Sequence, residues 1–204
     1  MQLISAQLTA TTTALRSVLS MEYPADLVLR RFFRENHLLG ANDRVFVAET
    51  VFGILRHKYY LECLVDLATP RALLFAYLAK FQGVHLRELT PHVSESEIKW
   101  LTQIKSMTVS TQPLAVQAEF PVWLVEKLRA FMPEAEILDL GRSLQLPASL
   151  DLRVNTIHAK RDSVLEKLKQ QGFEAEATPY SPVGIRVKGK PAINRHDFFL
   201  NGQI

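Results

Sequence analysis

The first half of the chain repeats its apolar residues at helical spacing, with no convincing alternation of period two. One helix is predicted from about Leu8 to Met21. Pro24 opens a second, which ends near Gly40. Asn42 is placed to cap a third helix, which we expect to be the central one. Its inward stripe is predicted to consist of Val45, Ala48, Phe52, Leu55 and Tyr59.

Two more predicted helices complete this region. Pro70 opens the first, which carries Phe75 and Ala79 inward. Ser94 and Glu97 have the spacing of a capping box, so they mark the start of the second. The whole region is therefore expected to be an all-α domain.

A stretch of Thr, Ser, Gln and Pro between residues 106 and 119 separates this region from the rest of the chain. It has no periodicity, which suits an exposed connection between two domains. After it, Pro121 and Pro133 each stand at the first turn of a predicted short helix.

The last part of the chain has the pattern of a mixed domain. Apolar and polar residues alternate over 150–155, as a half-buried strand requires. A helix follows from about Lys160 and stops at Gly172. Two further alternating runs predict strands around 173–178 and 185–188. The order strand, helix, strand, strand is typical of a small α+β domain.

The composition is that of an ordinary folded protein, because 48% hydrophobic content over 204 residues is enough for normal cores. Lys and Arg number 24 against 21 Asp and Glu, and the charge of +3 is spread along the chain. A polyanionic partner is therefore permitted and not required. No apolar run approaches the roughly 20 residues needed to cross a bilayer, and no signal peptide is recognisable, so we expect a cytoplasmic protein. The single cysteine excludes an internal disulfide.

The sequence offers no residues for a chemical reaction. Its glycines are isolated, and none forms the glycine-rich turn of a nucleotide cofactor site. Cys63 has Glu62 and Asp66 nearby, whose charges would raise the pKa of its thiol, and we expect it to be a small buried residue. The six histidines lack the spacing of a metal site. This chain alone is therefore predicted to be inactive, with no cofactor or metal of its own.

Arginines on the second predicted helix are the best candidates for contacts with RNA. Arg30, Arg31 and Arg34 lie three and four residues apart, so they share a face opposite Val28 and Phe32. Guanidinium groups placed in this way can contact successive phosphates. The alternative interpretation is an ordinary solvated face.

Smaller basic groups lie elsewhere in the sequence. One comprises Arg56, His57 and Lys58, and Arg16 would extend it. In the second domain, phosphates would be held by Arg153, Arg186, Lys188, Lys190 and Arg195. No aromatic residue occupies an outward strand position, so the sheet is not expected to stack on bases. Asn155 is expected to connect this domain to a neighbouring one.

Several other residues are interpreted as structural. Gly53 costs a helix about 1 kcal/mol relative to Ala, so close packing is expected beneath it. Arg44 is expected to pair with Glu35 or another carboxylate. Trp100 and Trp123 stand at core-compatible spacing on helices, and both are predicted to be packing residues.

Several motifs follow one another along the chain. They are Asn42-Asp43-Arg44 with Phe52-Gly53-Ile54-Leu55-Arg56, Phe120-Pro121-Val122-Trp123-Leu124-Val125, Asp151-Leu152-Arg153-Val154-Asn155-Thr156, Ala177-Thr178-Pro179-Tyr180-Ser181-Pro182-Val183-Gly184-Ile185-Arg186 and Phe198-Phe199-Leu200-Asn201-Gly202-Gln203-Ile204. In this order they resemble the bacterial ribosomal RNA (cytosine-5) methyltransferases known as the RsmB, Fmu or Sun family.

The resemblance implies an order of domains. Residues 1–110 would form an all-α bundle similar to the transcription antitermination factor NusB, and residues 111–119 a linker. Residues 120–204 would form the small α+β domain that stands before the methyltransferase domain. That catalytic domain, with its cysteines and its S-adenosylmethionine, would follow Ile204 in cis.

The resemblance also implies a function, namely recognition of RNA for a 16S-type ribosomal RNA cytosine-5 methyltransferase. RNA contacts are expected at Arg30, Arg31, Arg34, Arg56, Lys58 and Arg153. The alternatives are a NusB-like adaptor that binds RNA and protein in transcription or ribosome assembly, and a remnant without RNA affinity. The apolar end at 198–204 is expected to be exposed, and either to pack on the methyltransferase domain or to mediate self-association.

Overall fold

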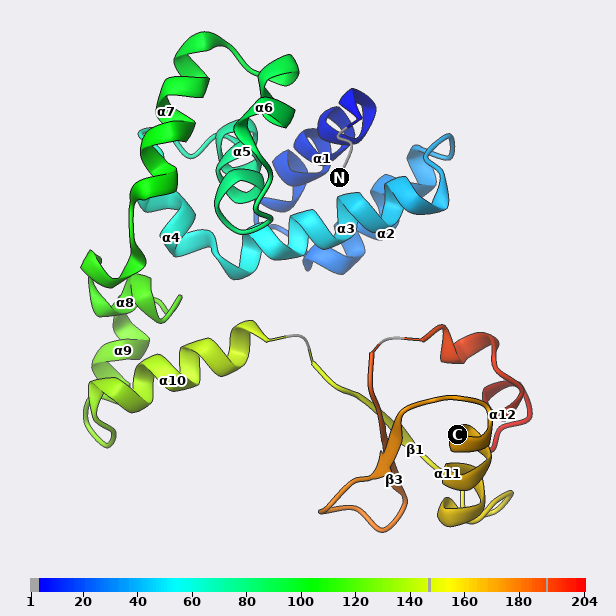
Figure 1. The fold of residues 1–204 in the computed structure, drawn as a ribbon. Coiled ribbons are helices and arrows are strands. Elements are labelled where there is room, and N and C mark those ends of the chain that lie inside the picture. Colours follow the sequence, from blue (N-terminus) through cyan, green and yellow to red (C-terminus); the bar gives the residue numbers. More distant parts are fainter. Residues whose placement is uncertain (1–3, 147, 190) are drawn as a thin grey trace. The chain divides into compact units, whose positions relative to one another are not determined.

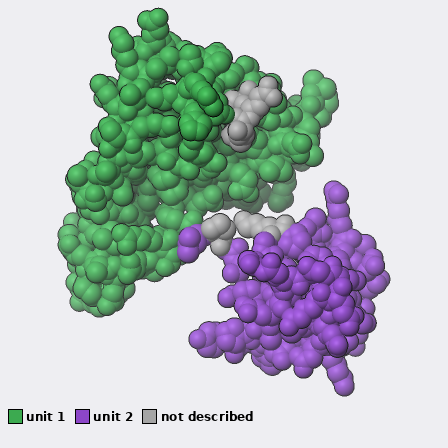
Figure 2. Space-filling model, viewed as in Figure 1, with its two compact units in different colours: residues 1–145 green, residues 146–204 purple. Residues whose placement is uncertain are grey.

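The computed structural model describes residues 4–146, 148–189 and 191–204, and it divides into two compact units, 1–145 and 146–204 (Figures 1 and 2). The first unit is helical and the second contains a sheet, as the sequence predicted. The helical unit contains α1 (Ser5–Val18), α2 (Ala25–Glu35), α3 (Ala41–Arg56), α4 (Lys58–Cys63), α5 (Pro70–Lys80), α6 (Leu86–Leu89), α7 (Glu95–Ser106), α8 (Leu114–Gln117), α9 (Val122–Leu128) and α10 (Glu134–Gln145). Short 3₁₀ turns lie at Thr90–His92 and Val109–Thr111.

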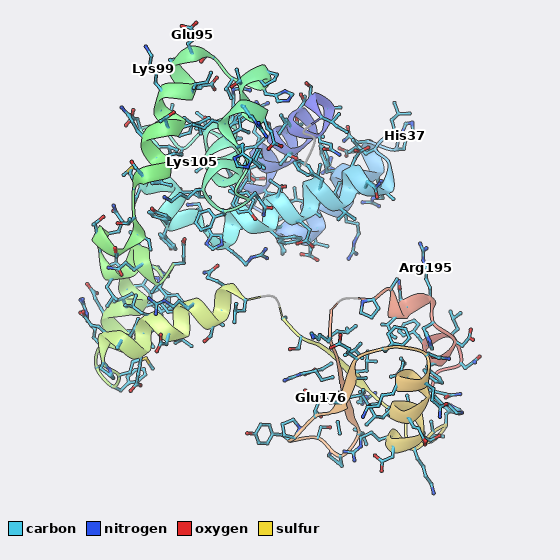
Figure 3. All side chains as sticks on the ribbon, in the orientation of Figure 1. His37, Glu95, Lys99, Lys105, Glu176 and Arg195 are labelled. Atoms are coloured by element: carbon cyan, nitrogen blue, oxygen red, sulfur yellow. The ribbon has the colours of Figure 1, made fainter. Side chains whose placement is uncertain are left out.

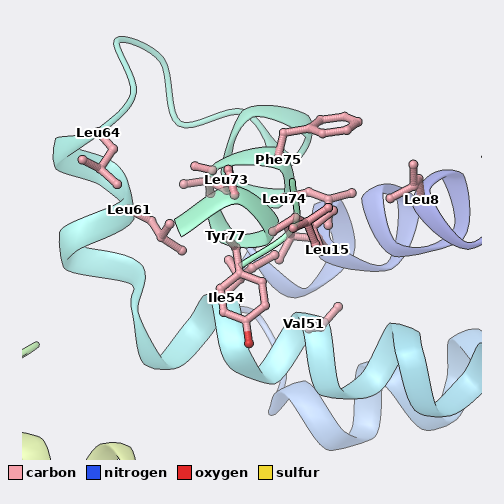
Figure 4. Packing of buried hydrophobic residues seen from close by; sticks show 14 of the residues in the cluster. Leu8, Leu15, Val51, Ile54, Leu61, Leu64, Leu73, Leu74, Phe75 and Tyr77 are labelled. Carbon is pink, nitrogen blue, oxygen red and sulfur yellow. The ribbon is translucent and has the colours of Figure 1, made fainter. Parts of the chain in front are cut away.

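The centre of the helical unit is α5, and the expectation that the third predicted helix is central is wrong. Every residue of α5 from Leu73 to Ala79 is buried, as is typical of a helix that is apolar on all sides. Side chains of α1, α3, α4 and α5 meet around it (Figure 4). The apolar stripe of the third predicted helix predicts only one buried face. The continuous apolar run of α5 can be buried only when other elements cover that helix on several sides.

The inward face of α3 also differs from the predicted stripe. Val47, Val51 and Ile54 are buried without exposed surface, whereas Val45 is 62% exposed. Ala48, Phe52 and Leu55 pack partly at the edge of the same cluster, and Tyr59 lies beyond the end of α3. Apolar residues cover more than one face of this helix, so their spacing alone did not determine which face turns inward.

Gly53 explains why α3 can approach α5 so closely. A Cβ at this position would lie 2.0 Å from the hydroxyl oxygen of Tyr77 and 2.3 Å from its Cζ, so no larger side chain fits beside that ring as it stands. The predicted close packing at Gly53 is confirmed. The cost of a glycine within a helix is offset here by the contact between two helices.

The helix ends follow local rules with two corrections. Ser94 caps α7 and Glu97 reaches back to the Ser94 N–H at 2.7 Å, so the predicted capping box is confirmed. Gly40 rather than Asn42 is the N-cap of α3, because the Asp43 carboxylate accepts a hydrogen bond from the Gly40 N–H. The second predicted helix ends at Glu35, several residues before Gly40.

Arg44 does not pair with Glu35 as expected. Its Nε donates to the carbonyl of Leu39 at 2.9 Å, and its guanidinium lies over the Phe33 ring. Glu35 is instead paired with Arg31. Arg44 therefore fixes the turn before α3, a structural role as proposed but with different partners.

The segment predicted as a linker folds onto the helical unit. It contains α8, and Ala118 and Phe120 form a small apolar cluster with buried residues of α9 and α10. Gly141 of α10 allows this contact, since a Cβ there would lie 2.5 Å from the Ala118 carbonyl oxygen. The compact units separate after Gln145. That residues 111–119 form the linker between two domains stays a prediction.

The small unit contains β1 (Leu150–Arg153), α11 (Arg161–Gln170), β2 (Ala175–Ala177), β3 (Gly184–Val187) and α12 (Asp197–Leu200), with a 3₁₀ turn at Ile193–Arg195. The strands form an antiparallel sheet in the order β1-β3-β2. Leu152 pairs with Ile185, and these buried residues pack on Val164 and Leu168 of α11. The predicted small α+β fold is confirmed.

The apolar end of the chain is only half exposed. Phe198 is 7% exposed and Ile204 packs partly on the core of the small unit, whereas Phe199 and Leu200 are exposed. Asn155 holds this tail, because its N–H donates to Gln203 at 2.8 Å and its side chain donates to Gly202 at 3.0 Å. Asn155 therefore binds the chain's own end.

No helix among the described residues is both long enough and apolar enough to cross a membrane. Within the same residues, no three side chains of His, Cys, Asp or Glu gather as potential metal ligands.

Candidate nucleic-acid interface

An open groove of about 650 Å³ lies beside α2 and collects the three predicted arginines of that helix. Arg30, Arg31 and Arg34 are exposed and line it, while Leu29 and Phe32 are buried and anchor α2 in the core. Val28 and Phe32 also border the groove, so the arginine face is not wholly opposite to them as expected. This arrangement follows from amphipathic spacing, since residues three and four apart lie on one helical face. The end of α1 and the turn before α2 complete the groove with Ser17, Ser20, Glu22 and Tyr23.

The three arginines differ in their electrostatic partners. Arg31 Nε lies 2.8 Å from Glu35 Oε1, and this hydrogen bond, followed by the charge of Glu35, holds the pKa of Arg31 above its usual value. Arg30 and Arg34 make no hydrogen bond or ion pair with any residue that the structure describes. Two unpaired guanidinium groups on adjacent turns form a site that attracts phosphates.

The second predicted cluster does not form one basic surface. Arg56 is exposed at the end of α3 without an ion pair in the described part of the chain. Lys58 Nζ lies 2.6 Å from Glu62 Oε1, so its charge is matched locally. His57 stacks on the Phe81 ring at 3.8 Å between centroids. Arg16 lines a separate pocket with Thr12 and Arg71 among others.

Glu119 is an unexpected part of the region around His57. Its carboxylate accepts hydrogen bonds from the N–H groups of Tyr59 and Tyr60, at 2.9 and 3.4 Å, and lies 3.5 Å from His57 Nδ1. The side chain is only 7% exposed. Glu119 thereby caps α4 from a position 60 residues away in sequence. Nothing in the local sequence indicates this contact, because it depends on how α8 packs.

The outward face of the sheet carries basic residues that are mostly matched by acids. Arg186 makes two hydrogen bonds to Asp151, both at 2.8 Å, and Lys188 lies 2.7 Å from Glu174. The Arg186 guanidinium holds the pKa of the Asp151 carboxyl below its usual value, first through hydrogen bonding and then through charge. Glu176 stands directly opposite Arg186 in the register.

Among the predicted phosphate ligands of the small unit that the structure describes, two remain without such partners. Arg153 is exposed at the end of β1, and Arg195 points away from the unit (Figure 3); neither has an ion pair within the described residues. Lys190, the other predicted phosphate ligand, lies outside the described residues. The sheet face therefore offers one unmatched strand cation, Arg153.

Two predictions about single residues are wrong. Cys63 is exposed, although the pKa of its thiol is raised as expected, first by desolvation and then by Glu119 and Glu62. Trp123 is 59% exposed on α9, because Val125 and Leu128 take the inward positions of that helix. Trp100 packs as predicted, and its Nε1–H donates to the carbonyl of Leu64 at 3.0 Å.

Comparison with known proteins finds similarity to one group of enzymes. Residues 120–194 match the family described as "Methyltr_RsmF/B-like, ferredoxin-like domain". The probable ribosomal RNA small subunit methyltransferase B of Synechocystis is 23% identical over 92% of this chain and 50% of its own length. Ribosomal RNA small subunit methyltransferase B of Pseudomonas syringae is 39% identical over 34% of this chain and 15% of its own length.

Solved structures agree on the fold. The crystal structure of PH0851 superposes over the whole of this chain and 53% of its own, with a TM-score of 0.62 and 18% identity. The chain spans about half the length of PH0851 and of the Synechocystis relative. It is similar to the amino-terminal part of RsmB/RsmF-like ribosomal RNA methyltransferases, which confirms the resemblance found in the sequence.

Proposed function

We propose that this chain is the RNA-recognition part of a cytoplasmic, S-adenosylmethionine-dependent ribosomal RNA cytosine-5 methyltransferase of the 16S type. The donor site and the catalytic cysteines belong to a domain outside this sequence. The names of the two relatives and the ferredoxin-like match support the enzyme class. The groove beside α2 supports the role of this part in holding RNA.

The unpaired guanidinium groups of Arg30 and Arg34 are the observation that carries this proposal. Each can donate several hydrogen bonds in a plane, a geometry that matches phosphate oxygens. They are four residues apart, a rise of about 6 Å along the helix, so one strand can be contacted at neighbouring phosphates. Arg31 joins them at the same groove, although Glu35 competes for it. Arg56 and Arg153 provide further cations for a longer RNA.

The decisive experiment reverses the charge of this face. The triple variant Arg30→Glu, Arg31→Glu, Arg34→Glu should lose most of the affinity for a fluorescein-labelled fragment of small-subunit ribosomal RNA. The loss follows because each phosphate contact releases counterions, and three contacts correspond to a slope of about −2 to −3 in log affinity against log salt. Fluorescence anisotropy over a salt series measures both quantities.

A matched control separates this site from a general effect of charge. Lys127→Glu, Arg129→Glu, Arg142→Glu makes the same change in net charge at exposed positions in α9, directly after it and in α10. Two of these cations have carboxylate partners, and exposed pairs contribute little to stability. Equal weakening in both triple variants, or unchanged affinity in the α2 variant, would exclude α2 as the RNA site.

A NusB-like adaptor is the second function in view, and the small unit argues against it. Residues 120–194 match a domain described for methyltransferases, which an adaptor built from the helical unit alone does not need. The two functions also differ experimentally. Joining the methyltransferase part of a relative to this chain should yield RNA methylation that the α2 reversal abolishes, whereas an adaptor would leave methylation unaffected by these arginines.

A further inference from the structure

The loop between β2 and β3 presents an aromatic ring to solvent. Tyr180 is 99% exposed, and its side chain has no hydrogen bond within the described residues. Pro179 precedes it and restricts the backbone at this point. Such a ring contributes nothing to the core of the small unit, so its position requires another explanation than packing.

This loop is a closed turn. The Thr178 N–H donates to the Gly184 carbonyl at 3.1 Å, and the Thr178 hydroxyl lies 3.4 Å from the Ser181 carbonyl oxygen. A Cβ on Gly184 would lie 2.1 Å from Thr178 Oγ1, so the base of the loop is closely packed. Tyr180 is therefore held at the tip of a short, well-connected turn, and little conformational entropy is lost when a ligand binds its ring.

A hollow of about 430 Å³ lies at the foot of this turn. It is lined by Asp151, Leu152, Arg153, Thr178, Pro179, Tyr180, Ser181, Gly184 and Arg186. Arg153 stands directly opposite Gly184 in the β1–β3 register. Gly184 is buried, and the Thr178 hydroxyl group takes the place that a side chain on Gly184 would need, so this hydroxyl borders the hollow. The hollow thus combines one aromatic ring, the guanidinium groups of Arg153 and Arg186, the Asp151 carboxylate that is paired with Arg186, and several hydroxyl groups.

The charges on the sheet direct an anion to this end. In the next outward-facing position of β3, Arg186 makes two hydrogen bonds to Asp151. Just beyond the end of β3, Lys188 is paired with Glu174. Arg153 alone among these strand cations has no acidic partner within the described residues. A phosphate is therefore attracted to the end of the sheet where Tyr180 is located.

We propose that this hollow binds one nucleotide of single-stranded RNA, with the base stacked on Tyr180 and its phosphate held by Arg153. The proposal rests on the RNA-recognition function above and adds a second contact in the small unit. Unpaired bases stack on exposed aromatic rings, and adjacent cations hold their phosphates. The lining offers guanidinium and hydroxyl groups that match the phosphate and the sugar of a nucleotide, beside apolar surface that a base can cover.

The test uses the full chain with a short labelled oligouridine and a duplex RNA of the same length. Tyr180→Ala should weaken binding of the single strand about tenfold and leave duplex binding unchanged, since only unpaired bases can stack on the ring. The salt slope should stay the same because no phosphate contact is lost. Arg153→Ala should instead reduce the slope by about 0.7.

Two further variants control for folding and for chemistry. Tyr180→Phe keeps the ring and should keep the affinity, and Lys188→Ala on the same sheet should have little effect because Lys188 is paired with Glu174. Tyr180→Trp, at so exposed a position, should fold normally and show quenching of its indole emission by the oligouridine. Far-ultraviolet circular dichroism checks that every variant is folded.

The outcomes distinguish this inference from the function on which it rests. Unchanged single-strand affinity in Tyr180→Ala overturns the nucleotide site, while a loss of affinity on α2 reversal would still support RNA recognition. Equal losses for single strand and duplex also overturn stacking. If the wild-type chain binds neither RNA, both proposals are wrong.

Discussion

The α2 face of the helical unit and the outer face of the sheet both carry basic residues, and they differ in what surrounds those residues. On α2, Arg30 and Arg34 have no acidic partner among the described residues. On the sheet, Arg186 and Lys188 are each paired with a carboxylate at 2.7 to 2.8 Å. A count of basic residues therefore says little about affinity for a polyanion. The relevant quantity is the charge left after pairing.

The interiors of the two units differ as well. The helical unit surrounds one wholly apolar helix, α5, so its helices must approach closely at small residues such as Gly53. The small unit has a modest core between one sheet and α11, and its outer sheet face is stabilised by cross-strand charge pairs. Packing defects should therefore be costly in the first unit, and changes of charge informative in the second.

The largest effect should come from filling the close contact in the helical unit. Gly53→Ala places a methyl group within 2.0 Å of the Tyr77 hydroxyl oxygen, and Tyr77 is almost completely buried. Overpacking of this kind costs typically about 1 to 3 kcal/mol, against a gain of about 1 kcal/mol in helix propensity. We expect a net loss of up to about 2 kcal/mol in the free energy of unfolding, measured by urea denaturation followed through Trp fluorescence.

Gly40→Ala is the matched control at the start of the same helix. The added Cβ there would lie 3.3 Å from a carboxylate oxygen of Asp43. This oxygen is at the end of a flexible side chain, so it can shift. We expect a change below about 1 kcal/mol. A similar loss in both variants would contradict the role of Gly53 in the approach of α3 to α5.

An intermediate effect should follow from turning the sheet into a surface like that of α2. Asp151→Asn with Glu174→Gln removes the carboxylates that pair with Arg186 and Lys188. Two released cations should raise RNA affinity about tenfold at low salt and steepen the salt slope by about 1.4. Anisotropy with the labelled oligouridine measures the change.

The control for this variant is Glu126→Gln with Glu136→Gln, two exposed acids on α9 and α10 that make the same change in net charge. If the control raises affinity equally, net charge and not local pairing governs binding. In that case the contrast between the two faces has no functional meaning.

The smallest effect concerns the pKa of Asp151. Its folded-state value is depressed by Arg186, so the stabilisation is complete above the unfolded pKa of about 3.9 and is lost as pH falls through the folded pKa. Arg186→Gln should return the carboxyl pKa upward towards its ordinary value, because both the hydrogen bonds and the charge are removed. Carbon-detected NMR titration of the Asp151 carboxyl measures this directly.

Lys188→Gln provides the comparison, since Lys188 is paired with Glu174 and is not the partner of Asp151. It should leave the Asp151 titration where it is in the wild type. An equal shift in both variants would show that the sheet acts through its general potential and not through the Asp151–Arg186 pair.

Much of the local structure was predictable from the sequence. The capping box at Ser94 and Glu97, the start of α5 at Pro70 and the end of α11 before Gly172 each depend on residues within one turn. Gly172 has a φ of +88°, a conformation that glycine adopts without steric cost. Alternation in the second half likewise predicted strands whose inward residues are apolar.

The failures of sequence reasoning concern contacts between distant elements. Trp123 stands at helical spacing, yet neighbouring residues took the inward positions of α9. Arg44 found a backbone carbonyl and an aromatic ring instead of a carboxylate. Cys63 is exposed where burial was expected. In each case the outcome depended on which face of a helix another element covers.

The sequence by itself determined the helices, the strands, their order and the positions of the arginines on α2, because these follow from periodicity, capping and turn preferences along a few residues. Only the tertiary structure decided that α5 is the buried centre and that Glu119 caps α4 from far along the chain. It also decided that Arg186 and Lys188 are paired with acids, whereas Arg30, Arg34 and Arg153 have no such partner within the described residues. The physical reason is that burial and charge pairing are set by neighbours in space, and these neighbours come from segments that periodicity cannot connect.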